Sequence, residues 1–173
     1  MISTFSFPAQ PDAMPAAAAV NPQGNLWIVG SAIFGSATNA PVVGLIAEVD
    51  SSGTKLLFSG AFGGLDPKGY TRISAVAIDP GGNLYLGGYT FQSDFPLTPS
   101  AFMSQFGNAS APAGCFWDGP PVYGFTAKLA QSTQTQPYTL TYSTLLGGQQ
   151  VPAGPCALPL PACRRWPWML TAW

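Results

Sequence analysis

The residues able to carry out chemistry are few in this sequence. Its 173 residues contain no histidine, which removes imidazole acid–base catalysis, Ser-His-Asp and Cys-His nucleophiles, and every zinc site that needs a histidine. The cysteines Cys115, Cys156 and Cys163 are odd in number and form no C-x-x-C pair, so the sequence predicts no metal site and no cofactor. What remains is a set of carboxylates: Asp12, Glu48, Asp50, Asp66, Asp79, Asp94 and Asp118.

Two of these carboxylates lie on predicted long loops, where binding and catalytic residues tend to be found. They are Asp94 and Asp118, and glycoside hydrolysis needs two carboxyl groups that face each other across the substrate. Phe116 and Trp117 precede Asp118 and would offer an aromatic platform for a sugar or a peptide. These four residues are therefore the candidate ligand-binding residues, and we assign no catalytic residue.

A structural interpretation stays open beside this one. Asp94 comes directly before a Phe-Pro pair and is expected to start a turn, and Asp118 is expected to be a solvated loop residue. Phe102 and Phe125 are expected in the core between sheets. Alternation along strands predicts that charged residues such as Glu48 and Lys128 face solvent.

The composition excludes two classes of partner. Six basic and seven acidic residues give a net charge of -1, with no basic face for a nucleic-acid backbone. Gly and Pro interrupt every apolar run before the roughly 18 residues that a membrane helix needs. Residues 1–15 contain no basic stretch followed by an apolar run, so we expect no signal peptide in this chain. With 20 Gly, 18 Pro and 47% hydrophobic residues, the chain is instead typical of short strands and tight turns.

The positioning elements come from an internal repeat. Residues 17–30 (AAAVNPQGNLWIVG) and 75–88 (AVAIDPGGNLYLGG) are identical at seven of fourteen positions. Two further matches follow in the same order, 44–49 with 124–129 and 56–64 with 140–148. The spacing between copies grows, which places an insertion at residues 100–122 of the second copy.

Each copy divides into four predicted strands. They are residues 16–20, 25–30, 43–49 and 55–61 in the first copy, and 73–78, 83–90, 123–129 and 138–145 in the second. The turn between the first two strands, Asn21–Gly24 or Asp79–Gly82, supplies Pro and then Gly for a left-handed position. This turn lacks the alternating acidic ligands and the closing Glu of a calcium loop. Four short strands in each repeat predict an all-β fold, a β-propeller fragment of about two four-stranded antiparallel blades.

The second copy carries a longer pattern that identifies a family resemblance. The segments Val76-Ala-Ile-Asp79, Gly82-Asn83-Leu-Tyr-Leu-x-Gly88, Ser93-Asp-Phe-Pro96 and Leu140-x-Tyr-Ser-Thr-x-Leu-Gly-Gly148 resemble the bacterial SBBP (seven-bladed β-propeller) repeat. The resemblance is specific through residues 73–148 and weaker through 16–64. It implies a parent protein that is secreted or on the cell surface of a bacterium, with several repeats in tandem, and it transfers no catalytic residue.

The chain is accordingly divided into a lead-in (1–15), a first blade (16–64), a second blade (65–148) and a tail (149–173). The tail does not continue the repeat and contains three of the five Trp residues. Read one base out of register, the codons of Trp166-Pro167 and Trp168-Met169 give Ala and Asp, as in the Ala-Val-Ala-Ile-Asp of residues 75–79. We expect that the reading frame slips between residues 148 and 163, with a third blade beyond it. The alternative is a true tail that caps the last blade.

Two blades do not close a propeller, which takes roughly 4 to 8. The expected partners are therefore further blades, missing from this chain or supplied by self-association, together with a glycan or protein ligand. The favoured function is a non-enzymatic extracellular scaffold or binding module. The alternative from another class is a fragment of a carbohydrate-active or lyase-type propeller enzyme whose catalytic residues lie elsewhere. A product of a broken reading frame without function also stays open.

Overall fold

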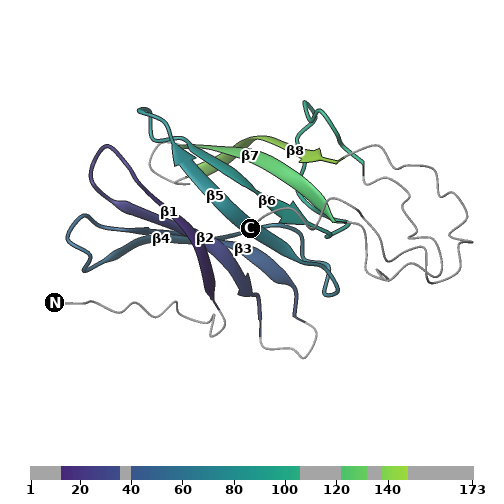
Figure 1. Cartoon of the computed structure of the whole chain (residues 1–173), viewed down its shortest axis with the longest axis horizontal. Helices are drawn as coiled ribbons and strands as arrows, with labels where there is room; N and C mark the ends of the chain where they lie inside the picture. Colours follow the sequence, from purple (N-terminus) through teal and green to yellow (C-terminus); the bar gives the residue numbers. More distant parts are fainter. Residues whose placement is uncertain (1–12, 36–39, 106–121, 132–137, 148–173) are drawn as a thin grey trace, which may run out of the picture. The chain divides into compact units, whose positions relative to one another are not determined.

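The chain folds into β-strands joined by tight turns (Figure 1). The structure is a computed structural model and describes residues 13–35, 40–105, 122–131 and 138–147. The strands in these ranges are β1 (Met14–Val20), β2 (Leu26–Ile33), β3 (Val42–Val49), β4 (Leu56–Phe62), β5 (Thr71–Ile78), β6 (Leu84–Thr90), β7 (Tyr123–Gln131) and β8 (Tyr138–Leu146). None of the described residues forms a helix, so none provides a helix that could span a membrane.

The strands form two antiparallel sheets of four strands each. The orders are β1-β2-β3-β4 and β5-β6-β7-β8, so that every strand pairs with the next one along the chain. The predicted fold class is confirmed: the protein is all-β, a propeller-like fragment of two blades that do not close into a ring. The predicted strands are all present, and the largest difference is at the end of β2, which continues to Ile33 instead of ending at Gly30.

The repeated turn has the predicted chemistry in both copies. In the first, the Gly24 amide donates to the Asn21 carbonyl at 2.9 Å, and Gly24 has a φ of +83°. The Asn21 side chain accepts from the amides of Gln23 and Asn25. In the second copy, Gly82 has a φ of +80°. A left-handed residue is required at this position, which is why glycine occupies it.

The two sheets repeat each other in their irregularities as well. Pairing of β1 with β2 shifts between Pro15 and Ala17, and pairing of β5 with β6 shifts between Ile73 and Ala75, at equivalent positions of the repeat. The third and fourth strands of each sheet also shift at equivalent places, after Glu48 and after Lys128. Because a bulge re-aims the side chains around it, the two copies present equivalent residues on equivalent faces.

Each sheet has two faces, since successive side chains point to opposite sides of a strand. The Trp27 face of the first sheet carries Trp27, Val29, Ile46, Phe58 and Phe62. The Leu86 face of the second sheet carries Leu84, Leu86, Phe125, Ala127 and Leu145. These two faces pack against each other and form one buried apolar core.

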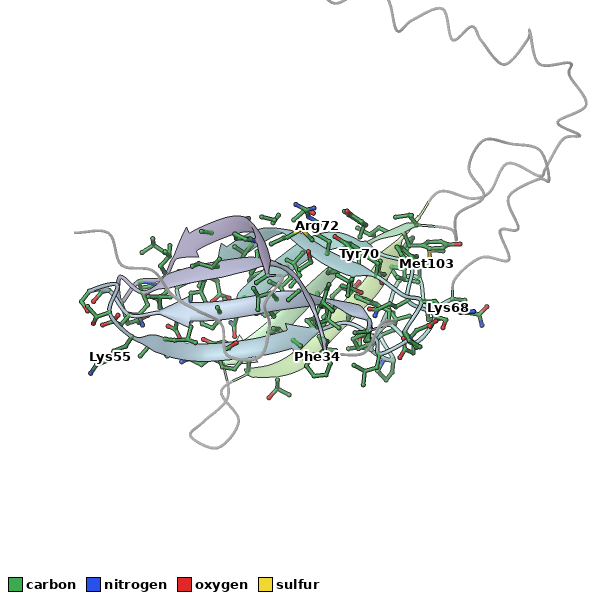
Figure 2. The ribbon with its side chains drawn as sticks, turned by 90° about the horizontal axis from the view of Figure 1, so that it is seen from below. Phe34, Lys55, Lys68, Tyr70, Arg72 and Met103 are labelled. Carbon is green, nitrogen blue, oxygen red and sulfur yellow. The ribbon has the colours of Figure 1, made fainter. Side chains whose placement is uncertain are left out.

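Aromatic rings join the sheets across this core. The ring centres of Trp27 and Tyr138 are 5.0 Å apart in an edge-to-face arrangement, and those of Phe62 and Phe125 are 5.8 Å apart. Strand β5, the first strand of the second blade, lies against β1, β2 and β3 of the first blade. Both sheets therefore belong to one compact unit. Figure 2 shows Lys55 and Lys68 at the ends of the sheets, directed away from the strands.

The prediction that Phe102 belongs to the core is wrong, whereas the same prediction for Phe125 is confirmed. Phe125 is buried on β7, but 86% of Phe102 is exposed. The reason is that Phe102 follows a turn closed by the Ala101 amide and the Thr98 carbonyl, so strand alternation does not apply to it. Met103 is the neighbour that packs against the core, and its carbonyl accepts from the Leu145 amide.

Candidate functional site

The Asp94 carboxylate is held in the loop that follows β6. It accepts hydrogen bonds from the backbone amides of Leu65 at 2.6 Å and Asp66 at 3.3 Å, so it binds the linker between the blades. Gly64 makes this approach possible, because a Cβ at that position would lie 1.9 Å from an Asp94 carboxylate oxygen. Asp94 is exposed and thus remains reachable by a ligand, while its described contacts are to the linker backbone.

The other candidate residues lie outside the described residues. They are Phe116, Trp117 and Asp118, all in the insertion at residues 100–122. The proposed pairing of Asp94 with Asp118, and the aromatic platform beside it, therefore stay predictions.

A buried polar group lies next to Asp94 and was not predicted from the sequence. The Gln92 side chain is fully buried, its Oε1 accepts from the Gly64 amide at 2.8 Å, and its Nε2 donates to the Gly64 carbonyl at 2.7 Å. Its Oε1 also accepts from the Thr71 hydroxyl, which is 2.8 Å from the Thr90 hydroxyl. A buried amide whose oxygen and nitrogen are both hydrogen-bonded in this way fixes the linker against the second sheet. The sequence feature that could have indicated this buried amide is the position of Gln92, a residue with a long amide side chain, just after an apolar strand.

Two hairpin turns, one after β5 and one after β3, use a carboxylate in the same structural way. Asp79 accepts from the backbone amide and the side-chain amide of Asn83, and these bonds hold the pKa of Asp79 below its usual value. Asp50 accepts from the Ser52 hydroxyl and from the amides of Lys55 and Thr54, which lower its pKa to about 2. A general acid for glycoside hydrolysis needs a raised pKa instead.

Glu48 differs from its prediction as a plain surface charge. It is half-buried, and its Oε1 accepts from the side-chain amides of Asn21 at 3.2 Å and Asn25 at 2.9 Å. The carboxylate thus ties β3 to the β1–β2 turn. Burial, with the Glu48 charge adding to it, raises the pKa of the Tyr138 hydroxyl to about 12, so this phenol is neutral at physiological pH.

A stack of aromatic rings lies at the start of the second sheet. The Tyr70 ring is 5.8 Å from that of Tyr89 and 5.7 Å from that of Phe91, and the planes are within 14° of parallel. The Tyr70 hydroxyl also lies 3.4 Å from the Ser31 hydroxyl of the first sheet. Figure 2 shows Tyr70 close to Arg72, at this end of β5. The three rings stack within the second blade, and Tyr70 joins this stack to the first blade through Ser31 and through its bridge to Val42.

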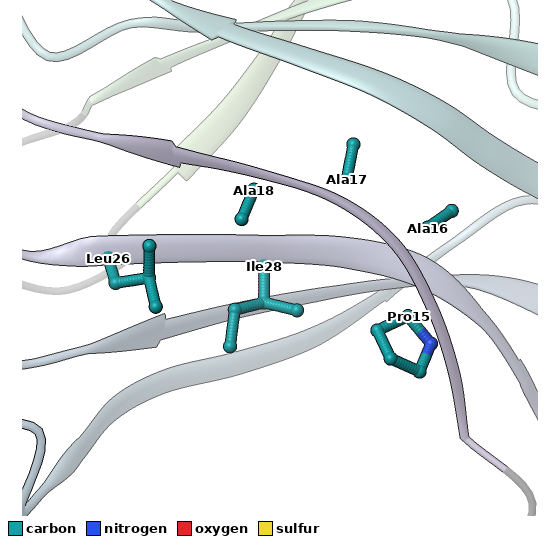
Figure 3. A pocket seen from close by; sticks show the side chains of 6 residues that line it. All are labelled: Pro15, Ala16, Ala17, Ala18, Leu26 and Ile28. Atoms are coloured by element: carbon teal, nitrogen blue, oxygen red, sulfur yellow. The ribbon is translucent and has the colours of Figure 1, made fainter.

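An apolar groove lies along β1 and β2 (Figure 3). It has a volume of about 380 Å³ and is lined by Pro15, Ala16, Ala17, Ala18, Leu26 and Ile28. No lining side chain carries a polar group, so the groove is suited to apolar contact and not to catalysis. No group of three or more His, Cys, Asp or Glu side chains within the described ranges could hold a metal ion.

No protein family and no curated protein matches the chain.

Proposed function

We propose that this chain is a non-enzymatic β-propeller repeat module that acts as an extracellular scaffold or binding module. One observation carries the proposal: the carboxylates of the described residues each hold a turn, a loop or a linker. Asp94 and Asp66 bind the linker region, Asp50 and Asp79 close hairpin turns, and Glu48 binds two asparagine amides. Side chains used in this way stabilise a framework.

The sequence resemblance to the SBBP repeat supports the same proposal. The motif residues of the resemblance are those that build the second sheet: the Asp79–Gly82 turn, the β6 segment, the Asp94 loop and the β8 segment. The resemblance implies a secreted or cell-surface parent protein in a bacterium, and we extend that localisation to this chain. The ligand would be a glycan or a protein, bound at the insertion that carries Phe116, Trp117 and Asp118.

The second candidate function is a fragment of a carbohydrate-active or lyase-type propeller enzyme. It is favoured by one feature, the exposed Asp94 carboxylate at the edge of the insertion.

The test exposes the purified chain to soluble polysaccharides (pectin, alginate, xylan and β-glucan) and measures binding, new reducing ends and new double bonds. We expect no turnover. We also expect binding to at least one of these polysaccharides, or to an immobilised glycan panel, that is lost in Phe116→Ala and Trp117→Ala. Phe102→Ala is the matched control, since Phe102 is an exposed aromatic outside the Phe116–Asp118 segment. Turnover that is abolished by Asp94→Asn or Asp118→Asn would establish the enzyme instead, and binding that survives both aromatic substitutions would remove the proposed site.

A further inference from the structure

The outer face of the first sheet is buried, although none of the described strands covers it. This face lies opposite the Trp27 face, and its residues on β3, which we call the Leu45 face, are Val43, Leu45, Ala47 and Val49. These four side chains are 0–2% exposed, yet they do not belong to the core between the sheets. Strand β5 of the second sheet packs on the Trp27 face instead, where Ile73 meets Gly44. Another part of the chain therefore covers the Leu45 face.

The second sheet shows how exposed an uncovered central strand is. On β7, the residues that face the first sheet are buried, whereas the alternate residues on the outer face, such as Thr126 and Lys128, are half-buried. Tyr85, which pairs with Lys128, is 40% exposed. Strand β3 shows no such difference, because every residue from Val43 to Ala47 is buried. The comparison indicates that β3 is covered on both faces.

The repeat indicates what kind of group the Leu45 face contacts. Leu45 corresponds to Phe125 of the second sheet, and Ala47 corresponds to Ala127. Phe125 is buried beneath the first sheet, and its ring centre is 5.8 Å from that of Phe62. On the second sheet, this side of the blade is thus covered by large apolar side chains. The segment that covers the Leu45 face must supply side chains of the same kind.

Membership of the compact unit narrows the choice of segment. The unit that contains both sheets does not include residues 107–121 or 148–173. Within this unit, residues 36–39 (SATN) and 132–137 (STQTQP) lie outside the described residues and contain no large apolar side chain. Residues 1–12 belong to the unit and contain several.

Residues 1–12 (MISTFSFPAQPD) have the required chemistry, with Ile2, Phe5 and Phe7. One polar residue separates the two phenylalanines, so both rings would lie on the same side of an extended chain. Phe106, another aromatic residue of this unit outside the described ranges, follows a loop that is bonded to β8 of the second sheet. Residues 1–12 are therefore the best source of the cover.

The chain enters β1 next to the buried face. Met14 pairs with Ser31 of β2, and the next residue of β2, Ala32, pairs with Val43 of β3. From Val43 to Val49, β3 extends about 20 Å. Twelve residues reach up to about 40 Å when extended. The segment that precedes β1 is therefore long enough to cross β2 and follow β3 over its length.

We propose that residues 1–12 fold back over the first sheet and bury Phe5 and Phe7 on the Leu45 face. Pro8 and Pro11 have no N–H group, so the segment is less suited to extend a sheet at its edge than to lie across a face. The cover is confined to β3 and the adjoining part of β2, since Leu57 on β4 is 51% exposed and the apolar groove lies open along β1 and β2 (Figure 3). The segment thus takes the place of a neighbouring blade on this face.

Nuclear Overhauser effects (NOEs) between methyl groups and aromatic rings test the contact in the full chain. We expect NOEs from the methyl groups of Val43 and Leu45 to the ring protons of Phe5 or Phe7. Phe5→Leu with Phe7→Leu should abolish these NOEs and shift the Leu45 methyl resonances, because leucine has no ring current. The Val29 methyl groups lie on the opposite face of the same sheet and are the matched control, whose resonances should not shift.

Replacement of both rings by a polar side chain tests their contribution to stability. Phe5→Ser with Phe7→Ser should increase amide hydrogen exchange in β3 by roughly tenfold or more, because two large apolar side chains lose their burial. Phe5→Leu with Phe7→Leu should retain most of the protection, since leucine also covers the face. Phe102→Ser should leave exchange unchanged and is the control, because Phe102 is an exposed loop residue.

Three results would overturn the proposal. In a folded chain, the absence of NOEs from Leu45 to Phe5 and Phe7, or NOEs to other rings instead, would assign the cover to another segment. NOEs that appear only between labelled and unlabelled chains in a mixed sample would assign it to a second copy. Unchanged exchange in the double serine variant would show that the two rings do not cover β3. The inference rests on the burial of β3 and on the repeat, so it can fail or hold independently of the proposed function.

Discussion

Trp27 is the residue on which the junction of the two blades centres. Its ring contacts Phe58 at 5.8 Å and Tyr138 at 5.0 Å, and its side chain is fully buried. Its indole Nε1 is buried without a hydrogen-bond partner. A buried donor without a partner costs about 1–3 kcal/mol. Burial of the Trp27 ring therefore stabilises the fold, while burial of its unpaired N–H group opposes this by a smaller amount.

This combination predicts different costs for two substitutions of Trp27. Trp27→Ala should lower the free energy of unfolding by about 3–5 kcal/mol, because it leaves a cavity between the sheets. Trp27→Phe should cost clearly less, since it keeps a ring in the core and removes the unpaired N–H. Urea unfolding followed by circular dichroism measures both.

The equivalent exposed position provides the control for this comparison. Tyr85→Phe should change the free energy of unfolding by no more than about 0.5 kcal/mol, as for most surface substitutions. A Trp27→Phe variant as unstable as Trp27→Ala would contradict the assignment of Nε1 as an unfavourable group.

The sequence predicts some residues well and others poorly, for physical reasons. The hairpin turns were predictable because Asn21 and Asp79 act on backbone groups only a few residues away. Gln92, Asp94 and Glu48 were not, because their partners lie 23 to 29 residues distant along the chain. Whether such a side chain binds a linker or a ligand depends on which segments the fold brings beside it.

At the scale of the elements, the alternation of apolar residues along strands predicts the sheets, but it does not predict which loop side chains are buried. The alternation of β7 places Phe125 in the core, whereas Phe102 lies in a loop to which alternation does not apply. The sequence pattern also did not predict the bulges, which occur at equivalent positions in both sheets and give the two copies the same strand register. The close approach of β5 to β3 depends on a glycine, because β3 has no side chain at Gly44, where Ile73 packs.

This close approach predicts that equivalent glycines differ in their tolerance of a methyl group. Gly44→Ala would place a Cβ 2.8 Å from Ile73 and from the Phe62 carbonyl, so the strands must shift, at a cost of about 1–3 kcal/mol. Gly124→Ala meets the Leu146 carbonyl at 3.1 Å and should cost clearly less. Thermal unfolding of both variants gives the comparison. Equal losses would show that Gly44 is not required for the contact between the blades.

At the scale of the whole molecule, the two blades share one core. The ring of Phe62 on β4 has its centre 5.4 Å from that of Phe95 and 5.8 Å from that of Phe125, and both of these residues belong to the second blade. Gln92 and Asp94 add hydrogen bonds from the second blade to the linker at Gly64 and Leu65. Repeat units that cannot bury a face alone are stabilised by their neighbours, so the first blade should not keep its structure when the second is lost.

The shared core therefore predicts that a substitution in one sheet destabilises both. Phe62→Ala on β4 should increase amide hydrogen exchange in β7 by a similar factor to that in β4, because both strands open in the same cooperative event. Leu57→Ala is the control on the same strand, since Leu57 is exposed and should leave exchange unchanged. Mass spectrometry of peptides from each sheet resolves the two effects. If exchange rose in β4 while β7 kept its protection, the blades would be independent units and the shared core would not couple them.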